Sequence, residues 1–228
     1  MSEWFERYGL GSREGALIER HLSLVIEANA RLNLTRIDTF DDGMLLHVED
    51  SLAGLPEVTA AQPGFLGDMG SGAGFPGIPL AIATGRRTVL VDSVAKKAAA
   101  LDGFIGELGL EAQVSTFAGR LEDLCATRRS SFAVLTARAV AQTGALMELA
   151  APLLVMGGRL VCYKAQPTED EVNHARELEP VLGLKLVGDR SFLLSDGVTG
   201  RRILTFEKVA KPTVSLPRRT GMAQKKPL

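Results

Sequence analysis

The ten residues from Asp68 to Gly77 combine a carboxylate with closely spaced glycines, a pattern that suits an adenosine-containing ligand. They read Asp-Met-Gly-Ser-Gly-Ala-Gly-Phe-Pro-Gly. Glycine removes the side-chain barrier to positive φ, so the backbone at Gly70 and Gly72 can turn sharply beneath a ligand. The run from Gly72 to Gly77 also satisfies G-x-G-x-x-G, which occurs in dinucleotide folds. The glycines alone therefore do not decide the ligand class.

Asp68 and the prolines that follow favour a methyl donor over a dinucleotide. At the end of an apolar strand, the Asp68 carboxylate would repel a pyrophosphate but not the cationic methionine moiety of S-adenosylmethionine. Pro76 and Pro79 lie around the first turn of the next helix, where a missing backbone N–H costs little. That turn therefore need not be rich in donors for a pyrophosphate. We expect S-adenosylmethionine as the cofactor, with Asp68, Gly70 and Gly72 at its site.

Three charged residues follow later strands of the same predicted core. Asp92 ends the second strand 22 residues after Gly70, where an acidic side chain can accept both ribose hydroxyls, or can cap the next helix. Glu122 follows the third strand and either meets the adenine edge or simply begins a helix. Arg138 follows the fourth strand, where it would bind a substrate phosphate, orient the donor or neutralise the nearby carboxylates.

Cysteine and histidine usage predicts neither a disulfide framework nor a metal centre. Cys125 and Cys162 are far apart and lie in segments expected to be a helix and a strand. His21, His47 and His174 lack metal-ligand spacing. We expect buried, unreactive thiols and no metal.

Seven short apolar runs predict an α/β core over residues 61–208. The expected strands are 65–69, 87–92, 112–117, 132–137, 158–164, 185–193 and 203–208. Helical patterns separate most of the first five, which predicts a doubly wound, mostly parallel sheet. The last two are joined by a polar turn too short for a helix and should pair antiparallel at one edge. This is the Rossmann-like pattern of class I methyltransferases.

Residues 1–60 are expected to form an N-terminal helical cap. Apolar residues recur every three or four positions from Leu17 to Leu32, with charged residues between them, as in an amphipathic helix. A second helix should run from about Asp41 to Leu55 and end at Pro56.

The C-terminal tail, residues 209–228, concentrates positive charge. From Lys208 to Leu228 there are six basic residues and no acidic one, which leaves 20 basic against 27 acidic residues, a net charge of −7, in the remainder. Such a tail suits an anionic partner such as nucleic acid, or is a solvated, disordered extension. No apolar run spans a membrane and the start does not resemble a secretory signal, so we expect a cytoplasmic monomer without a membrane partner.

Motifs along nearly the whole chain resemble the RsmG (GidB) family of small-subunit ribosomal RNA methyltransferases. The most specific are Asn33-Leu-Thr35 and Gly74-Phe-Pro-Gly-Ile-Pro79. The others are His47-Val-Glu-Asp-Ser51, the rest of the glycine turn, Asp92-Ser93, Lys96-Lys97, Arg138-Ala139, Tyr163-Lys164 and the basic ending from Pro217.

The resemblance implies methyl transfer from S-adenosylmethionine to N7 of a guanine in 16S ribosomal RNA, in a loop near the decoding region. The RNA would be free or within the small ribosomal subunit or its precursor. Carried over by position, the family's donor-binding residues are Gly70, Phe75, Leu121, Glu122 and Arg138. Ala137 departs from the serine that commonly precedes the arginine. We expect RNA contacts from the tail and from the pairs Lys96-Lys97 and Arg201-Arg202.

The residues agree with N7 chemistry. Guanine N7 has an unprotonated lone pair at neutral pH, so alignment matters more than a general base. The sequence has no Asn-Pro-Pro-aromatic motif after the fourth strand, as amine methylation often uses, and no cysteine there for attack on a pyrimidine. We hypothesise that Arg138 or Lys164 contacts the base as a catalytic residue, although Lys164 could equally be a snorkelling residue at a strand end.

Two other classes compete with this interpretation. An NAD(P)-dependent Rossmann oxidoreductase would use the glycines and Asp92 equally well, but the chain lacks a Tyr-x-x-x-Lys pair or an obvious catalytic histidine. A non-catalytic RNA-binding factor would require loss of the donor pocket, against which Asp68, Gly70 and Asp92 argue. The sequence assigns no role to Asn33 or His47.

Overall fold

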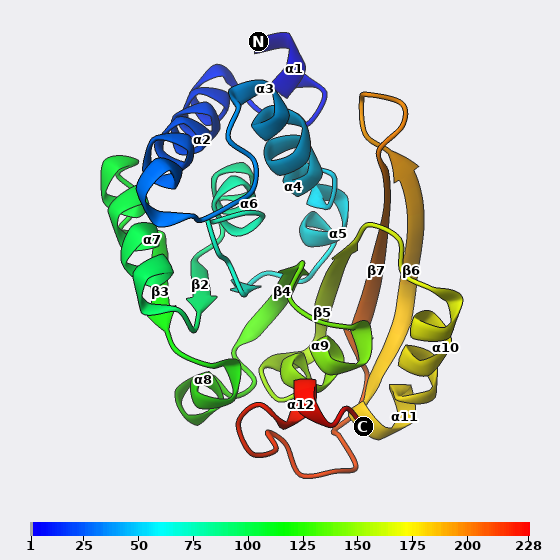
Figure 1. The fold of residues 1–228 in the computed structure, drawn as a ribbon. Coiled ribbons are helices and arrows are strands. Elements are labelled where there is room, and N and C mark those ends of the chain that lie inside the picture. The colour runs from blue at the N-terminus through cyan, green and yellow to red at the C-terminus, as the bar shows by residue number, and fades with distance from the viewer. Residues whose placement is uncertain (1) are drawn as a thin grey trace.

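The computed structural model describes residues 2–228, which form one seven-stranded sheet between two layers of helices (Figure 1). The strand order is β3-β2-β1-β4-β5-β7-β6, and β7 is antiparallel to both of its neighbours. The strands are β1 Phe65–Met69, β2 Thr88–Asp92, β3 Val114–Ala118, β4 Phe132–Arg138, β5 Leu154–Lys164, β6 Leu184–Leu193 and β7 Gly200–Lys208. The predicted α/β class and its antiparallel edge hairpin are confirmed.

Burial along the strands follows their place in the sheet. Every residue of the inner strand β2 is buried, because helices cover both of its faces. The edge strand β6 instead alternates between partly buried and exposed positions after its buried first residue. The carboxyl ends of β1 to β5 share one edge, which is where open α/β sheets bind ligands.

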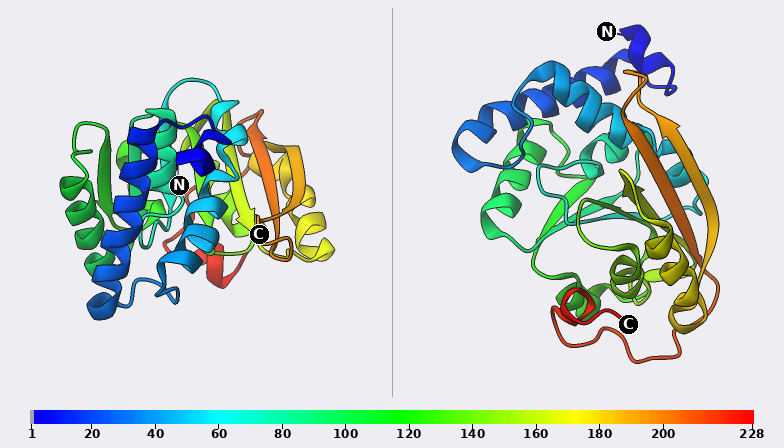
Figure 2. Two further views of the ribbon diagram at one scale, coloured as in Figure 1. Left: turned by 90° about the horizontal axis from the view of Figure 1, so that it is seen from above. Right: turned by 45° about the vertical axis from the view of Figure 1, so that its right-hand side comes forward.

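The two helical layers lie on opposite faces of the sheet (Figures 1 and 2). On one face, α2 (Ser12–Leu32) packs against α6 (Gly77–Thr84) and α7 (Ala95–Glu107). The other face is covered by α8 Leu121–Arg128, α9 Thr143–Ala150, α10 Glu169–Glu177 and α11 Glu179–Leu182. None of the helices described between residues 2 and 228 is long and apolar enough to cross a membrane.

The helices before β1 differ from the prediction at one point. The expected helix from Asp41 to Leu55 is a continuous stretch of three elements that ends at Leu52. Pro56 lies in the first turn of a further helix, where its missing N–H has no partner to lose. The elements are α1 Ser2–Glu6, α3 Phe40–Gly43, a π-helix η1 Met44–Glu49, α4 Asp50–Leu52 and α5 Leu55–Thr59. A π-turn is rare and often marks a functional site.

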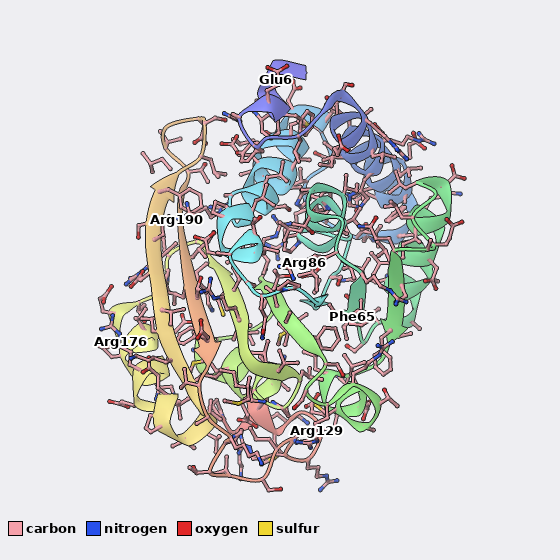
Figure 3. The ribbon with its side chains drawn as sticks, turned by 180° about the vertical axis from the view of Figure 1, so that it is seen from behind. Glu6, Phe65, Arg86, Arg129, Arg176 and Arg190 are labelled. Atoms are coloured by element: carbon pink, nitrogen blue, oxygen red, sulfur yellow. The ribbon has the colours of Figure 1, made fainter. Side chains whose placement is uncertain are left out.

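Arg86 fixes the linker that joins these helices to the sheet, at the edge opposite the carboxyl ends (Figure 3). Its guanidinium donates hydrogen bonds to four carbonyl oxygens, those of Val58, Ala61, Gln62 and Gly64. The backbone that leads into β1 is therefore fixed, and β1 in turn leads to the glycine turn.

The C-terminal tail folds back onto the core. It carries a short helix, α12 (Met222–Lys225), which lies beside α9 in Figure 1. Leu216 and Ala223 are 7% and 3% exposed and join the core cluster on the α8–α9 face. The tail is therefore part of the folded structure and not a solvated extension.

Candidate functional site

The glycine turn leaves β1 in a conformation that only glycine adopts without strain. Gly70 and Gly72 have φ of +73° and +57°. The Gly70 N–H donates to the Val91 carbonyl over 2.8 Å, which holds the turn against β2. A Cβ placed on Gly70 would lie 2.6 Å from Cγ2 of Val140, in the loop after β4. The turn therefore needs glycine for both its backbone angle and its close approach.

Asp68 stabilises this turn through hydrogen bonds of its carboxylate. Its carboxylate is 1% exposed and accepts hydrogen bonds from the Thr136 hydroxyl at 2.8 Å and from the Gly77 N–H at 3.2 Å. Burial raises the pKa of this carboxyl group. The carboxylate thus ties β1 to β4 and to the start of α6. A direct contact with the donor, as expected from the sequence, would require this buried carboxylate to become accessible.

Asp92 lies beside the glycine turn at the end of β2. Its Oδ2 accepts the Gly72 N–H at 2.9 Å, and its Oδ1 accepts the Val94 N–H at 2.8 Å. The second bond stabilises the turn into α7, so the expected role at a helix start is partly present, although Val94 is the N-cap residue. The first bond places a carboxylate directly against the glycine backbone, where a ribose acceptor would lie.

His21 supports the same turn from α2. Its Nε2 lies 3.0 Å from the Ala73 carbonyl oxygen and therefore carries the proton, while Nδ1 has no partner among the described residues. Burial lowers the pKa of His21 to about 3. The sequence alone assigned no role to His21. Its position on the apolar face of a predicted helix was the one feature that could have indicated a buried role.

A narrow cleft opens beside the glycine turn, which we call the glycine-turn cleft. It encloses about 70 Å³. Its walls are formed by Gly70, Val91, Ser93, Gly119, Arg120, Leu121, Glu122, Val140, Leu149 and Gln224. Leu121, expected at the donor site from the resemblance alone, lines it, and so does Glu122, expected there also from its place after the third strand. Gln224, from the tail, was not expected there.

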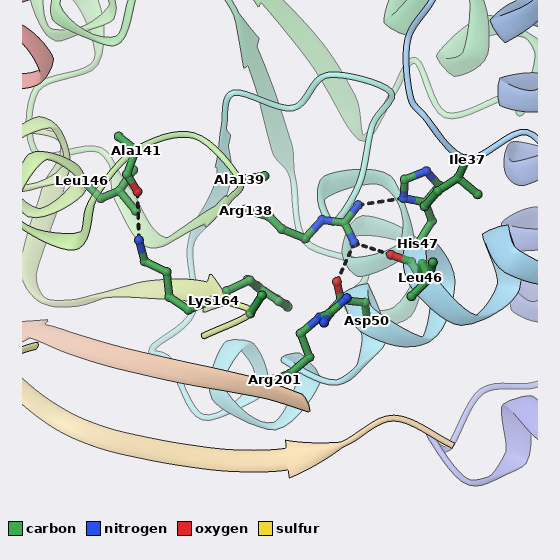
Figure 4. A pocket seen from close by; sticks show the side chains of 12 residues that line it. Ile37, Leu46, His47, Asp50, Arg138, Ala139, Ala141, Leu146, Lys164 and Arg201 are labelled. Atoms are coloured by element: carbon green, nitrogen blue, oxygen red, sulfur yellow. Dashed lines mark hydrogen bonds and ion pairs between the residues drawn. The ribbon is translucent and has the colours of Figure 1, made fainter. Parts of the chain in front are cut away.

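A larger cavity lies on the other side of the loop after β4, and we call it the Arg138 cavity (Figure 4). It encloses about 390 Å³. Its walls are formed by Ile37, Leu46, His47, Asp50, Arg138, Ala139, Ala141, Leu146, Tyr163, Lys164, Ala165 and Arg201. Arg138 and Lys164, the residues predicted to be catalytic, therefore both line this cavity. The cleft and the cavity meet at the loop from Arg138 to Ala141, since Val140 lines the cleft and its neighbours line the cavity.

Arg138 is held in the cavity wall by the π-helical segment. One guanidinium nitrogen, Nη1, donates to the Leu46 carbonyl at 3.0 Å and to Oδ2 of Asp50 at 3.1 Å. The other, Nη2, lies 3.1 Å from Nδ1 of His47. Arg201 Nε donates to the second Asp50 oxygen at 3.0 Å, so this carboxylate bridges two guanidinium groups.

His47 is a neutral acceptor in this network. A guanidinium can only donate, so Nδ1 accepts from Arg138 and Nε2–H donates to the Thr35 hydroxyl oxygen over 2.9 Å. The imidazole stacks on Phe75, with ring centroids 4.6 Å apart and planes 5° apart. Burial lowers the pKa of His47 to about 3, and the charge of Arg138 adds to this effect. Phe75 is not among the residues that line the cleft or the cavity; it supports His47.

Lys164 is paired within the cavity wall. Its Nζ lies 2.6 Å from Oε1 of Glu171 and donates to the Ala141 carbonyl at 2.9 Å. Glu171 also accepts the Thr143 N–H and hydroxyl, and its carboxyl pKa is lowered by these bonds and by Lys164 despite an opposing effect of burial. Lys164 therefore sits at the loop that separates the two pockets.

Other predicted groups lie apart from the site or are neutralised. Cys125 and Cys162 are buried thiols whose pKa values burial raises to about 11 and about 12. Arg201 and Arg202, expected to contact RNA, are ion-paired to carboxylates of the protein itself. Among residues 2–228, no three His, Cys, Asp or Glu side chains are grouped to hold a metal ion.

The fold and the site together define a class I methyltransferase. An O-methyltransferase from Bacillus cereus in complex with SAH has a similar structure, with a TM-score of 0.58 and 21% identity over 83% of this chain and 91% of that chain. A geranyl diphosphate methyltransferase in complex with GPP and sinefungin is also similar, with a TM-score of 0.56 and 15% identity over 70% and 77%. At these identities the likeness concerns the fold.

Sequence comparison identifies the family. Residues 15–191 match the family described as rRNA small subunit methyltransferase G. The protein named Ribosomal RNA small subunit methyltransferase G from Streptococcus pyogenes serotype M49 (strain NZ131) is 36% identical over 225 residues, 97% of this chain and 94% of that protein. The serotype M12 (strain MGAS2096) relative matches equally well. The chain belongs to this family and is an S-adenosylmethionine-dependent methyltransferase. An oxidoreductase, the alternative weighed above, is not supported.

Proposed function

We propose that this protein transfers a methyl group from S-adenosylmethionine to N7 of a guanine in 16S ribosomal RNA, in the loop near the decoding region. The observation that carries the proposal is the meeting of the glycine-turn cleft and the Arg138 cavity at the loop from Arg138 to Ala141. The cleft is lined by residues expected around the donor's adenosine, and the cavity is large enough for a flipped-out base, so donor and acceptor would approach at that loop.

The residues around the glycine turn fit the donor. At Gly70 a side chain would clash with Val140, so the backbone there is bare for a ligand. Asp92 would accept ribose hydroxyls, while Leu121 and Glu122 would flank the adenine. When bound, S-adenosylmethionine supplies a methyl group carried on a positively charged sulfur.

The cavity positions a base rather than deprotonating it, which favours N7 as the acceptor. Its only imidazole, that of His47, points its lone pair at Arg138, and the Asp50 carboxylate is bonded to two guanidinium groups. Neither group is free to take a proton from an amine. Guanine N7 needs no deprotonation, so alignment accounts for the rate enhancement.

Arg138 and Lys164 are the proposed catalytic residues. Both line the cavity, and their N–H groups would hydrogen-bond to the O6 edge of the guanine and so hold N7 in line with the methyl group. Phe75 is proposed to act through His47, on which it stacks, and Asp68 to act through the backbone of the glycine turn.

RNA contacts are proposed for exposed basic residues near the cleft. In the tail, Arg219, Lys225 and Lys226 are exposed, whereas Arg218 is paired with Glu148. Lys96, at the start of α7, is also exposed. We propose that the protein acts as a monomer. The substrate would be this RNA, free or within the small ribosomal subunit or its precursor, in the cytoplasm.

Methylation with labelled S-adenosylmethionine tests the proposal. We expect the wild-type protein to label 16S ribosomal RNA, as free RNA or in small subunits. The Asp92→Ala variant, used in its place, should transfer no label. Calorimetry should show binding of S-adenosylmethionine and no binding of NADH. Transfer to no form of this RNA would contradict the proposal.

A further inference from the structure

The C-terminal segment, residues 216–228, forms one wall of the glycine-turn cleft. Gln224 lines the cleft across from residues of the sheet edge and α8. The Gly221 N–H donates to Oε1 of Glu122 over 2.7 Å. Glu122 thus faces the cleft while a bond to the tail fixes its carboxylate.

An ion pair between Arg218 and the buried carboxylate of Glu148 anchors this wall to α9. Arg218 Nε donates to Oε1 of Glu148 over 2.7 Å, and its Nη2 donates to the second carboxylate oxygen. Glu148 is 3% exposed, and a bidentate bond to such a carboxylate is strong. The same Nη2 also donates to the Lys226 carbonyl at 2.9 Å, so Arg218 also holds the C-terminal end of α12.

The cleft is too small for an adenosine in this closed form. Its volume of about 70 Å³ is well below the several hundred Å³ that small-ligand pockets usually enclose. One wall must therefore yield when the donor enters. The walls from β1, β2 and α8 are part of the sheet and its covering helices. The tail wall is attached through a few side chains and bonds: Arg218, Gly221, the Arg129 bond to the Leu216 carbonyl, and the buried Leu216 and Ala223.

We propose that residues 216–228 are a movable wall of the methyl-donor site, which moves outward from the position seen here when the donor enters and then rests against the bound adenosine. With the donor bound, the Gln224 amide would face the adenine edge and Gly221 would orient Glu122 toward it. This inference rests on the proposed donor site. It extends that site to a segment whose basic composition alone suggests only an RNA contact.

Arg218 and Arg219 provide a matched test, because each substitution removes one positive charge from the tail but only Arg218 holds Glu148. Binding of S-adenosylhomocysteine would be measured by calorimetry and its dissociation by stopped flow. We expect Arg218→Ala to weaken binding about 5- to 10-fold and to speed dissociation similarly, as the loss of one or two hydrogen bonds implies. Arg219→Ala should leave both unchanged.

Gln224→Ala tests the direct contact without touching the anchor. S-Inosylhomocysteine differs from S-adenosylhomocysteine at the adenine amino group, so the ratio of the two affinities reports on a partner at that edge. We expect this ratio to fall several-fold in Gln224→Ala. Unchanged donor affinity, dissociation and ratio in Arg218→Ala and Gln224→Ala, with normal binding by the wild type, would overturn the movable wall alone. Absence of binding by the wild type would instead overturn the proposed function.

Discussion

Nη2 of Arg138 lies 3.1 Å from Nδ1 of His47, although 91 residues separate them in the chain. This contact joins the end of β4 to the π-helical segment Met44–Glu49, and Asp50 reinforces it from the next turn. The guanidinium is therefore positioned by the helices that precede the sheet. The site depends on both parts of the chain.

Replacing Arg138 should impair turnover more than stability. Arg138→Ala removes the central donor of the cavity, and we expect single-turnover methylation of ribosomal RNA to fall about 100-fold, as when one preorganised donor is lost. Arg138→Lys keeps the charge but cannot make the bonds of both guanidinium nitrogens, so it should recover only part of the wild-type turnover. Full turnover and donor affinity in Arg138→Ala would contradict its role.

Thr35 should fix the tautomer of His47. The Thr35 hydroxyl oxygen accepts Nε2–H, which leaves Nδ1 as the acceptor for Arg138. We expect Thr35→Val to change the ¹⁵N shifts of His47 and lower turnover about tenfold, while Thr35→Ser restores both. If Thr35→Val lowers turnover without altering the His47 signals, the threonine acts in another way.

Gly70 and Gly85 separate backbone strain from steric conflict. Both have positive φ, +73° and +67°, but only a Cβ at Gly70 meets another atom, Cγ2 of Val140 at 2.6 Å. We expect each alanine substitution to lower the free energy of unfolding by about 1 kcal/mol through strain, and Gly70→Ala by more. Donor affinity should fall in Gly70→Ala only. An equal loss of affinity in Gly85→Ala would argue against a role specific to the turn.

His21 and His47 should make stability depend on pH. Burial lowers the pKa of each to about 3 in the folded state, against about 6.5 unfolded. Below pH 6.5 the unfolded chain therefore binds protons that the folded chain does not, and the free energy of unfolding falls by up to about 1.4 kcal/mol per pH unit for each histidine.

Urea denaturation at pH 6.5 and pH 5 would measure this dependence. His21→Gln should show a smaller loss between the two pH values than the wild type, since one of the two groups is gone. His174→Gln, at a partly exposed site on α10, should match the wild type. Identical losses in His21→Gln and the wild type would contradict the assignment.

The exposed tail lysines should contribute to the salt dependence of RNA binding. Lys225 and Lys226 are exposed beside the cleft. If each meets one phosphate, the double Lys→Ala variant should reduce the slope of log affinity against log salt by about 1.4 to 1.8. An unchanged slope would place the RNA contact elsewhere.

Much of the fold was predictable because its signals are local. Apolar runs and turn residues placed all seven strands within a few residues, and the short turn before Gly200 predicted the antiparallel pair β6–β7. The π-turn at Met44–Glu49 was not predictable, because an apolar repeat does not distinguish it from an ordinary helix. The same limit explains the early end of that helical stretch at Leu52.

The site was predictable in composition but not in its contacts. Spacing after the strands placed Asp92, Glu122 and Arg138 at one edge of the sheet, as the structure has them. The bonds of Arg138 to His47 and Asp50 join segments about 90 residues apart, and no local pattern reports such contacts. For the same reason, a tail rich in basic residues gave no sign that Gln224 would line the cleft.

The identity of the methylated atom tests the central claim most directly. Ribosomal RNA methylated by the purified protein would be digested to nucleosides and analysed by mass spectrometry, with borohydride and aniline cleavage to locate the site. We predict 7-methylguanosine at one position of the 16S RNA and its absence with Arg138→Ala. Methyl groups found only on an amine, a carbon or a ribose would contradict an account in which the cavity aligns a base without deprotonating it.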